Sequence, residues 1–237
     1  MDLPRTLYGQ LYLLAYDLKR RRFDYTKLWL LGYALRGATL AELVMTGHLQ
    51  DVDGTARRAG GWPPNDPVFR TTLDAIEADE PKPWSQLVVD SEKDAGRLVR
   101  DQLEDHGWIC LRRRRRFGLV PMRWHAPNDE GAVLALADRA STALCNAVEG
   151  RSADPRALTV GLLGILGELP VLLTHEGLAD HRARLRELAL ATAGPIAGMH
   201  EAVEAVYAEM GGNRNGDNHS GCGGGCGGCG GCGGCGG

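Results

Sequence analysis

Apolar side chains recur every three or four residues along most of the chain, and this spacing predicts a mainly α-helical protein. The pattern is clearest from Leu28 to Thr46, where Gly47 follows at the position that glycine often takes after a helix. Leu7 to Ala15 is apolar on several faces, as in a buried helix or strand. Further helices are predicted at Val68–Ala78, near Pro83, and at Ser91–His106, Glu130–Glu149, Pro155–Leu173, Leu178–Ala193 and Pro195–Met210.

Two segments have the pattern of β-hairpins. Leu49 to Arg58 carries Asp53-Gly54 in its middle, a pair that favours a tight turn. Trp108 to His125 consists of two strand-like halves that flank residues 116–119. We therefore expect a single helical-bundle domain over residues 3–210, with two small β-hairpins.

The C-terminal residues 211–237 are mostly glycine, cysteine, asparagine and serine. Such a composition buries too little apolar surface to offset the entropy of ordering, so we expect a disordered tail. Its C-x3-C and C-x2-C spacings suit a soft metal ion, with the candidate ligands Cys222, Cys226, Cys229, Cys232 and Cys235. A structural zinc site usually needs two such pairs held apart by a folded loop, and here only glycine intervenes. We therefore predict no cofactor beyond an adventitious soft metal on the tail.

The net charge of the chain is −3, which excludes a generally basic nucleic-acid coat protein. The second hairpin nevertheless contains five consecutive arginines, which predict a local anionic partner. Basic strands with an apolar tip suit an anionic membrane, because the arginines can meet headgroups while the tip enters the interface. The predicted membrane-contact or dimer hairpin comprises Arg112, Arg113, Arg114, Arg115, Arg116, Phe117 and Leu119.

The strength of such an anchor is limited. At ~1 kcal/mol for each basic side chain near an anionic leaflet, five arginines give about 5 kcal/mol, or a Kd of roughly a few hundred micromolar. Firm attachment then needs a specific pocket, the apolar tip, or avidity from a dimer. Pairing of the arginines with acidic residues of a second copy is an open alternative.

The same hairpin could serve as the wing of a winged-helix nucleic-acid binder. The preceding helix argues against this alternative, because its carboxylates would repel phosphates: Asp94, Asp101, Glu104 and Asp105. A third alternative is a metal-binding protein in which the cysteine-rich tail is the working part.

No catalytic site is legible, and we expect a non-enzymatic binding protein. The chain has no Walker loop, no G-x-S-x-G and no dinucleotide fingerprint. His175 and His181 are six residues apart, which is not the spacing of a helical zinc-protease site. Glu42 and Glu168 lie in apolar helical stretches, where structural hydrogen bonding is the expected role.

The sequence also predicts a cytoplasmic location. No secretory signal is visible, and the body contains only Cys110 and Cys145, which fits a reducing compartment. The longest apolar run, residues 157–173, is interrupted by Glu168 and Pro170 and is typical of a buried core helix.

The order and spacing of several motifs resemble the Golgi phosphoprotein 3 family over about residues 7–209. The resemblance is carried by Leu35-Arg36-Gly37-Ala38-Thr39-Leu40-Ala41-Glu42-Leu43, Asn65-Asp66-Pro67-Val68, Trp84-Ser85-Gln86-Leu87, and Asp154-Pro155-Arg156-Ala157-Leu158. It implies a peripheral protein on the cytosolic face of a membrane. Eukaryotic relatives bind phosphatidylinositol 4-phosphate in a basic pocket, carry a projecting hairpin and link membranes to protein clients.

The resemblance implies the headgroup-binding residues Trp29, Arg36, Lys93 and Arg97. Arg36 matches the pocket arginine of the family, and Lys93 matches one member of its second basic pair. Trp29 lies two residues closer to Arg36 than the family tryptophan, and Gly96 replaces the other basic residue beside Arg97. The composition is rich in arginine, alanine and glycine, which is typical of bacteria with GC-rich DNA such as actinobacteria. Together with these departures from the family pattern, it favours an anionic headgroup in general over phosphatidylinositol 4-phosphate specifically.

Overall fold

The computed structural model describes residues 3–23, 27–61, 64–76, 81–90, 92–116, 120–173, 178, 181–192 and 194–212. At positions 92–94, 114–116, 120–122, 173, 182 and 210–212 it describes the backbone only. Apart from Gly211 and Gly212, which are helical, the predicted disordered tail lies outside these residues, with its five candidate metal-ligating cysteines. Phe117 and Leu119 lie outside them as well. Residues 1–204 form one compact unit, and residues 205–237 form a second.

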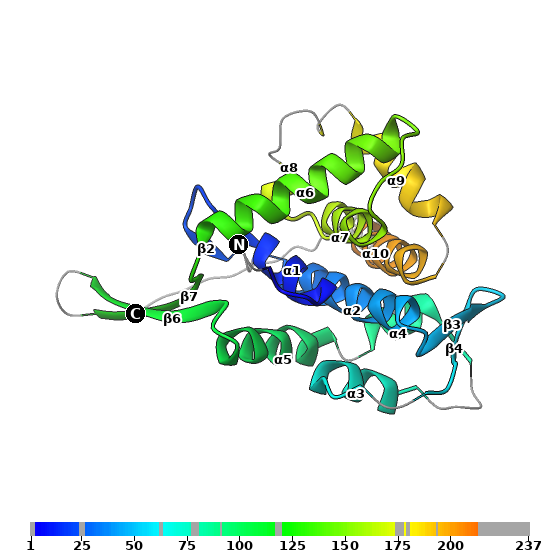
Figure 1. Cartoon of the computed structure of the whole chain (residues 1–237), viewed down its shortest axis with the longest axis horizontal. Helices are drawn as coiled ribbons and strands as arrows, with labels where there is room; N and C mark the ends of the chain where they lie inside the picture. The colour runs from blue at the N-terminus through cyan, green and yellow to red at the C-terminus, as the bar shows by residue number, and fades with distance from the viewer. Residues whose placement is uncertain are drawn as a thin grey trace, which may run out of the picture. The chain divides into compact units, whose positions relative to one another are not determined.

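Helices dominate the chain, as the apolar pattern predicts (Figure 1). The helices are α1 (Leu7–Leu14), α2 (Leu28–Met45), α3 (Pro67–Asp74), α4 (Trp84–Val89), α5 (Glu92–Asp105), α6 (Glu130–Val148), α7 (Pro155–Leu166), α8 (Pro170–Leu173), α9 (Arg182–Ala191) and α10 (Pro195–Gly212). The strands are β1 (Tyr16–Asp17), β2 (Arg22–Phe23), β3 (Leu49–Val52), β4 (Thr55–Arg58), β5 (Lys82–Pro83), β6 (Ile109–Arg116) and β7 (Val120–Pro127).

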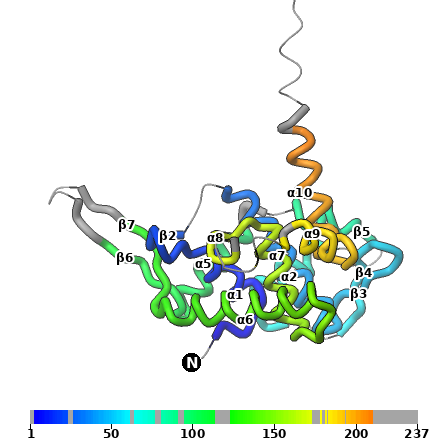
Figure 2. The backbone as a smooth tube through the Cα atoms, turned by 90° about the horizontal axis from the view of Figure 1, so that it is seen from above, coloured from blue at the N-terminus to red at the C-terminus, as the bar shows by residue number. Residues whose placement is uncertain are grey.

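The core forms around α1 and α2, which pack against each other and against α7. Every residue of α1 is buried, which explains why its apolar residues show no single helical face. The other side of α7 packs against α6, while α2 also contacts α5 (Figure 2). By length and composition α2 is the one described helix that could cross a membrane, but 78% of it is buried inside the protein.

A buried carboxylate joins three of these helices. Glu42 of α2 accepts a hydrogen bond from the backbone N–H of Leu7 at 2.6 Å. Its other oxygen accepts one from Arg156 Nη2 of α7 at 2.5 Å. The structure thus confirms a hydrogen-bonding role for Glu42.

Both predicted hairpins are present. Asp53 and Gly54 have φ values of 54° and 77°, the left-handed conformation that a tight hairpin turn requires. β5 adds a third strand to this hairpin by pairing with β4. A further hairpin, β1–β2, was not predicted, because strands of two residues are too short to show an alternating pattern.

One predicted helix is broken. The expected continuous helix Pro155–Leu173 ends at Leu166 and resumes as the short α8. Glu168 takes a left-handed φ of 51°, and Pro170 has no N–H to continue the ladder. Glu168 pairs with Lys27 at 2.5 Å, so it too has a structural partner.

Two other predicted helices are shorter than expected. α3 ends at Asp74 and not at residue 78, and α9 begins at Arg182, four residues after the predicted start at Leu178. Element ends are weakly encoded, because capping and tertiary packing decide where a helix stops.

Gly198 of α10 lies in close contact with α4, and its substitution should be destabilising. A Cβ at this position would lie 2.4 Å from Trp84 Cβ and 2.6 Å from the Trp84 carbonyl carbon, so α4 and α10 would have to separate. We expect Gly198→Ala to lower the free energy of unfolding by about 1–3 kcal/mol, as in other overpacked cores.

Gly96→Ala is the matched control, because a Cβ there would have no neighbour within 4 Å. Helix propensity predicts a gain of up to ~1 kcal/mol for this variant. Urea denaturation of both variants checks the prediction, and equal stability of Gly198→Ala and wild type would contradict the packing argument.

Candidate anion-binding site

Arg36 lies in the middle of α2 and is almost fully buried, with 4% of its surface exposed. Its Nε donates a hydrogen bond to the carbonyl oxygen of Leu87 at 3.0 Å, and Nη1 donates to Thr72 Oγ1 at 2.5 Å. These contacts connect α2 to α4 and α3. The remaining amino group, Nη2, is buried and finds no hydrogen-bond acceptor among the residues that the structure describes.

The charge of Arg36 is poorly compensated. Burial lowers the pKa of its guanidinium well below the ordinary value, to about 10, and the carboxylate of Asp90 opposes part of this shift. This pKa change means that the protein disfavours the charged form by roughly 3 kcal/mol. None of the ion pairs between described residues includes Arg36. A phosphate oxygen at Nη2 would therefore gain a charge-assisted hydrogen bond.

Trp29 lies on the same side of α2 as Arg36, because positions seven apart are two turns apart on one helix face. Its ring packs edge-on against Tyr33, with centroids 5.5 Å apart and an angle of 79°. Trp29 is half-buried at the start of α2. Trp29 and the buried Arg36 thus share one face of α2.

The second predicted basic pair lies on α5, which packs against α2. Arg97 is exposed, and the side chain of Lys93 lies outside the described residues. The hydrogen bonds of Arg36 run to α3 and α4. The helices α2 and α5 therefore pack together. The described residues do not show one pocket that contains Trp29, Arg36, Lys93 and Arg97.

The β6–β7 hairpin is rich in arginine, and it extends away from the helices (Figure 1). Ile109 to Pro127 contains six arginines and no aspartate or glutamate. The pairing places Arg113 directly opposite Arg123, and both are exposed. Like charges at opposite positions destabilise a sheet unless an anion lies between them or solvent screens them.

Alternation gives the two faces of this hairpin different character. Arg112 lies opposite Trp124, so one face combines a cation with an indole. The other face carries Arg113 and Arg123. Sequence reasoning placed Arg123 and Trp124 on the second hairpin but did not include them among the candidate contact residues.

No metal site accompanies these cations in the described part of the chain, where no group of three His, Cys, Asp or Glu side chains comes together. Cys110 and Cys145 are free thiols.

A polar cluster near the N-terminus is structural. Asp66 caps α3 by accepting from the N–H groups of Val68 and Phe69. The same carboxylate accepts from the Tyr8 hydroxyl at 2.5 Å and from Gln102 Nε2 at 2.8 Å. With these four donors, Asp66 ties α1, α3 and α5 together.

This cluster should make stability fall in alkaline solution. Burial, and then the hydrogen bond to Asp66, raise the pKa of Tyr8 well above its ordinary value of 10.0. The unfolded chain loses this proton near pH 10 while the folded chain keeps it, so stability present below pH ~10 is lost as the pH rises further. Unfolding free energies between about pH 9 and 11 should fall less steeply for Tyr8→Phe than for wild type. Equal pH dependence of the unfolding free energy in the two proteins would contradict a raised pKa of Tyr8 in the folded state.

Comparison with known families gives a match over most of the chain. A family model described as Golgi phosphoprotein 3 (GPP34) matches residues 7–210 of the chain. Among curated proteins, none matches. The matched span includes α1 through nearly all of α10, and therefore both Arg36 and the β6–β7 hairpin.

Proposed function

Because the chain belongs to the Golgi phosphoprotein 3 family, we propose that it is a non-enzymatic peripheral membrane adaptor that binds anionic lipid headgroups. The observation that carries this proposal is the β6–β7 hairpin, whose sequence contains six arginines and no carboxylate and whose pairing places Arg113 opposite Arg123. An anionic leaflet would supply the charge that the opposed Arg113 and Arg123 lack. The proposed location of the protein is the cytosolic face of a membrane.

The hairpin would provide long-range attraction, and Arg36 would provide the specific contact. At ~1 kcal/mol for each arginine near an anionic leaflet, six arginines give at most about 6 kcal/mol, which is still a Kd of tens of micromolar. A charge-assisted hydrogen bond from Nη2, the one Arg36 nitrogen without a described partner, would add energy and geometric selectivity. Trp29, Lys93 and Arg97 are the proposed neighbours of this contact.

The surroundings of the hairpin favour a membrane over a nucleic acid. Asp101, Glu104 and Asp105 of the preceding helix are exposed, and Glu104 lies 3.5 Å from His125 at the base of β7. A duplex that contacted the hairpin as a wing would also meet these carboxylates. A flat anionic leaflet can meet the end of the hairpin alone. The family's general association with membrane lipids and proteins agrees with an adaptor role, with a protein client or a second copy as the further partner.

Arg36→Met tests the pocket. Methionine has a similar length but no charge, so it removes the cost of burying a cation while leaving the Leu87 carbonyl without its donor. We expect the free energy of unfolding to stay within about 1 kcal/mol of wild type, because these two effects oppose each other. Binding to anionic vesicles should nevertheless weaken by roughly tenfold or more, the value of one charge-assisted hydrogen bond.

Vesicle co-sedimentation with neutral, generally anionic and phosphatidylinositol 4-phosphate-containing membranes measures this loss. Thr72→Val is the matched control, since it removes one acceptor from Arg36 and keeps the cation. Selective loss with Arg36→Met supports a headgroup pocket. Unchanged binding by Arg36→Met would assign Arg36 a purely structural role and leave the hairpin as the only contact.

A further inference from the structure

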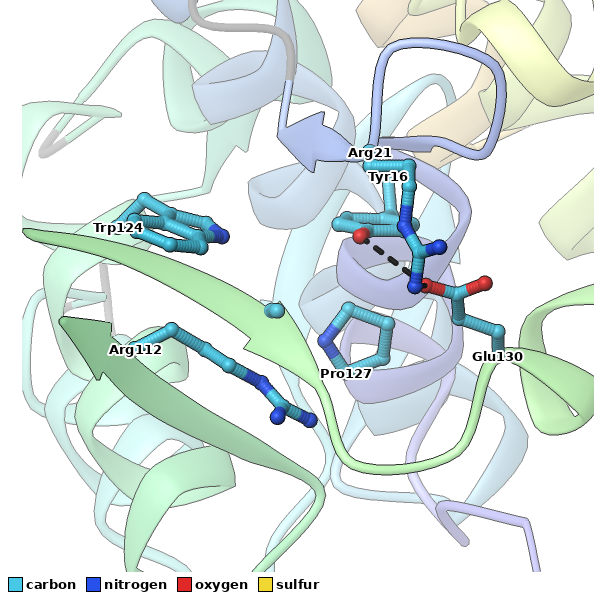
Figure 3. Close-up of a pocket in the computed structure, with 7 residues that line it drawn as sticks. Tyr16, Arg21, Arg112, Trp124, Pro127 and Glu130 are labelled. Atoms are coloured by element: carbon cyan, nitrogen blue, oxygen red, sulfur yellow. Dashed lines mark hydrogen bonds and ion pairs between the residues drawn. The ribbon is translucent and has the colours of Figure 1, made fainter. Parts of the chain in front are cut away.

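A cavity of about 430 Å³ lies where the base of the β6–β7 hairpin meets the β1–β2 hairpin and the start of α6. Its volume is within the range of small-molecule sites. Figure 3 shows its two ends. Arg112 and Trp124 lie side by side at one end, Tyr16, Arg21 and Glu130 lie at the other, and Pro127 lies between them.

The cations at the two ends differ in their partners. Arg21 Nη2 pairs with Glu130 Oε1 at 2.8 Å, which neutralises this arginine. Arg112 is exposed and forms no ion pair with a described carboxylate, and in Figure 3 its guanidinium points toward Pro127. The cavity therefore has a net positive charge, which is concentrated at the Arg112 end.

The opposite end offers groups that suit hydroxyls. Glu130 Oε1 also accepts from the Tyr16 hydroxyl, at 3.4 Å. Within the described part of the chain, Oε2 of Glu130 accepts no hydrogen bond and is available to a ligand hydroxyl. Burial, followed by the charge of Glu130, raises the pKa of Tyr16, so its hydroxyl remains a donor.

Apolar surface separates the two polar ends. The indole of Trp124 and the ring of Pro127 form this part of the wall, with the ring of Tyr16 behind them. Flat apolar rings suit the C–H faces of a polyol or the glycerol region of a lipid. A simple inorganic anion would leave this surface unused.

We propose that this cavity binds the phosphate ester of a small polyol, with the phosphate at Arg112, the carbon skeleton against Trp124 and a hydroxyl at Glu130. The source that fits best is an anionic phospholipid headgroup, and this choice rests on the membrane-binding function proposed above. The site is distinct from Arg36, which is buried against α3 and α4. It would let the hairpin select a headgroup by shape as well as by charge.

Arg112 and Arg113 provide an internal control. They are consecutive and both exposed, but alternation along β6 places them on opposite faces, and only Arg112 lines the cavity. Isothermal titration calorimetry of the full chain with soluble dihexanoyl phosphatidylglycerol should show binding that Arg112→Ala weakens by roughly tenfold or more. Arg113→Ala should change the affinity for this lipid by less than about twofold, because Arg113 lies on the opposite face of β6 and salt screens its exposed charge. Thermal melting of both variants verifies folding, and Trp124→Phe is a second, conservative variant for the apolar wall.

Three ligand arms distinguish the sources. Dihexanoyl phosphatidylcholine tests the need for net negative charge, sn-glycerol 3-phosphate tests the free ester, and sodium phosphate tests the anion alone. Stronger binding of the short-chain anionic lipid than of the other three supports the headgroup. Equal binding of sodium phosphate, or equal losses with Arg112→Ala and Arg113→Ala, would overturn the proposal.

Vesicle co-sedimentation separates this proposal from the proposed function. Binding to anionic vesicles without any heat from the short-chain lipid would refute the cavity site and leave membrane binding intact. Absent vesicle binding would refute the membrane function, while binding of sn-glycerol 3-phosphate that depends on Arg112 and not on Arg113 would still support the cavity as a polyol phosphate site.

Discussion

Reversing the charges of Arg113 and Arg123 to glutamate is expected to weaken binding to anionic vesicles by more than about thirtyfold. Loss of two basic side chains near an anionic leaflet removes about 2 kcal/mol, or roughly thirtyfold in affinity, and the two new carboxylates add repulsion. Arg113 and Arg123 are cross-strand partners on an exposed face, so both should reach the same headgroups.

Arg57 and Arg58 are the matched control for this reversal. They are also exposed arginines on a hairpin, at the end of β4, and their change to glutamate alters the net charge by the same amount. If net charge alone controlled binding, the two double variants would lose affinity equally. We expect the β4 variant to stay within about threefold of wild type, because charges farther than a Debye length from the leaflet are screened.

The second large effect concerns stability. Glu42→Ala should lower the free energy of unfolding by about 3 kcal/mol, because it leaves the Leu7 N–H and the Arg156 guanidinium without their shared acceptor. The Glu42 side chain is 8% exposed, so water cannot readily replace the lost contacts. Three helices depend on this carboxylate, and the loss should appear in urea denaturation as a lower midpoint.

Comparison of Glu168→Ala with Glu42→Ala tests how much burial adds to the contribution of an ion pair to stability. Glu168 pairs with Lys27 at 2.5 Å, the same separation as between Glu42 and Arg156, but the two side chains are 31% and 47% exposed. Exposed ion pairs contribute at most about 1 kcal/mol, so this variant should lose much less stability. Similar losses for the two variants would show that burial does not determine the value of the Glu42 contacts.

Local patterns predicted much of the fold. Asp53-Gly54 located the β3–β4 turn, and the two apolar halves on either side of residues 116–119 located β6 and β7. The sequence could not reveal that β5 joins β4, because Lys82 and Pro83 pair only through tertiary contact. The break at Glu168 was also missed: the left-handed conformation of this residue leaves no periodic signal, although Pro170 is itself a sign that a helix ends.

The candidate site was only partly predictable. The resemblance singled out Arg36, but nothing local indicated that Thr72 and Leu87 would enclose its guanidinium. Burial of a cation depends on which helices pack over it, and that is a property of the assembled fold. The cavity beside Trp124 was missed for the same reason, because its walls come from three separate parts of the chain.

Binding of the full chain to vesicles of increasing anionic lipid content, at physiological salt, tests the central claim most directly. The account predicts no sedimentation with neutral vesicles, a steep rise with anionic lipid, and loss of binding at high salt. Equal sedimentation with neutral and anionic vesicles, or none with either, would contradict a protein that recognises anionic headgroups.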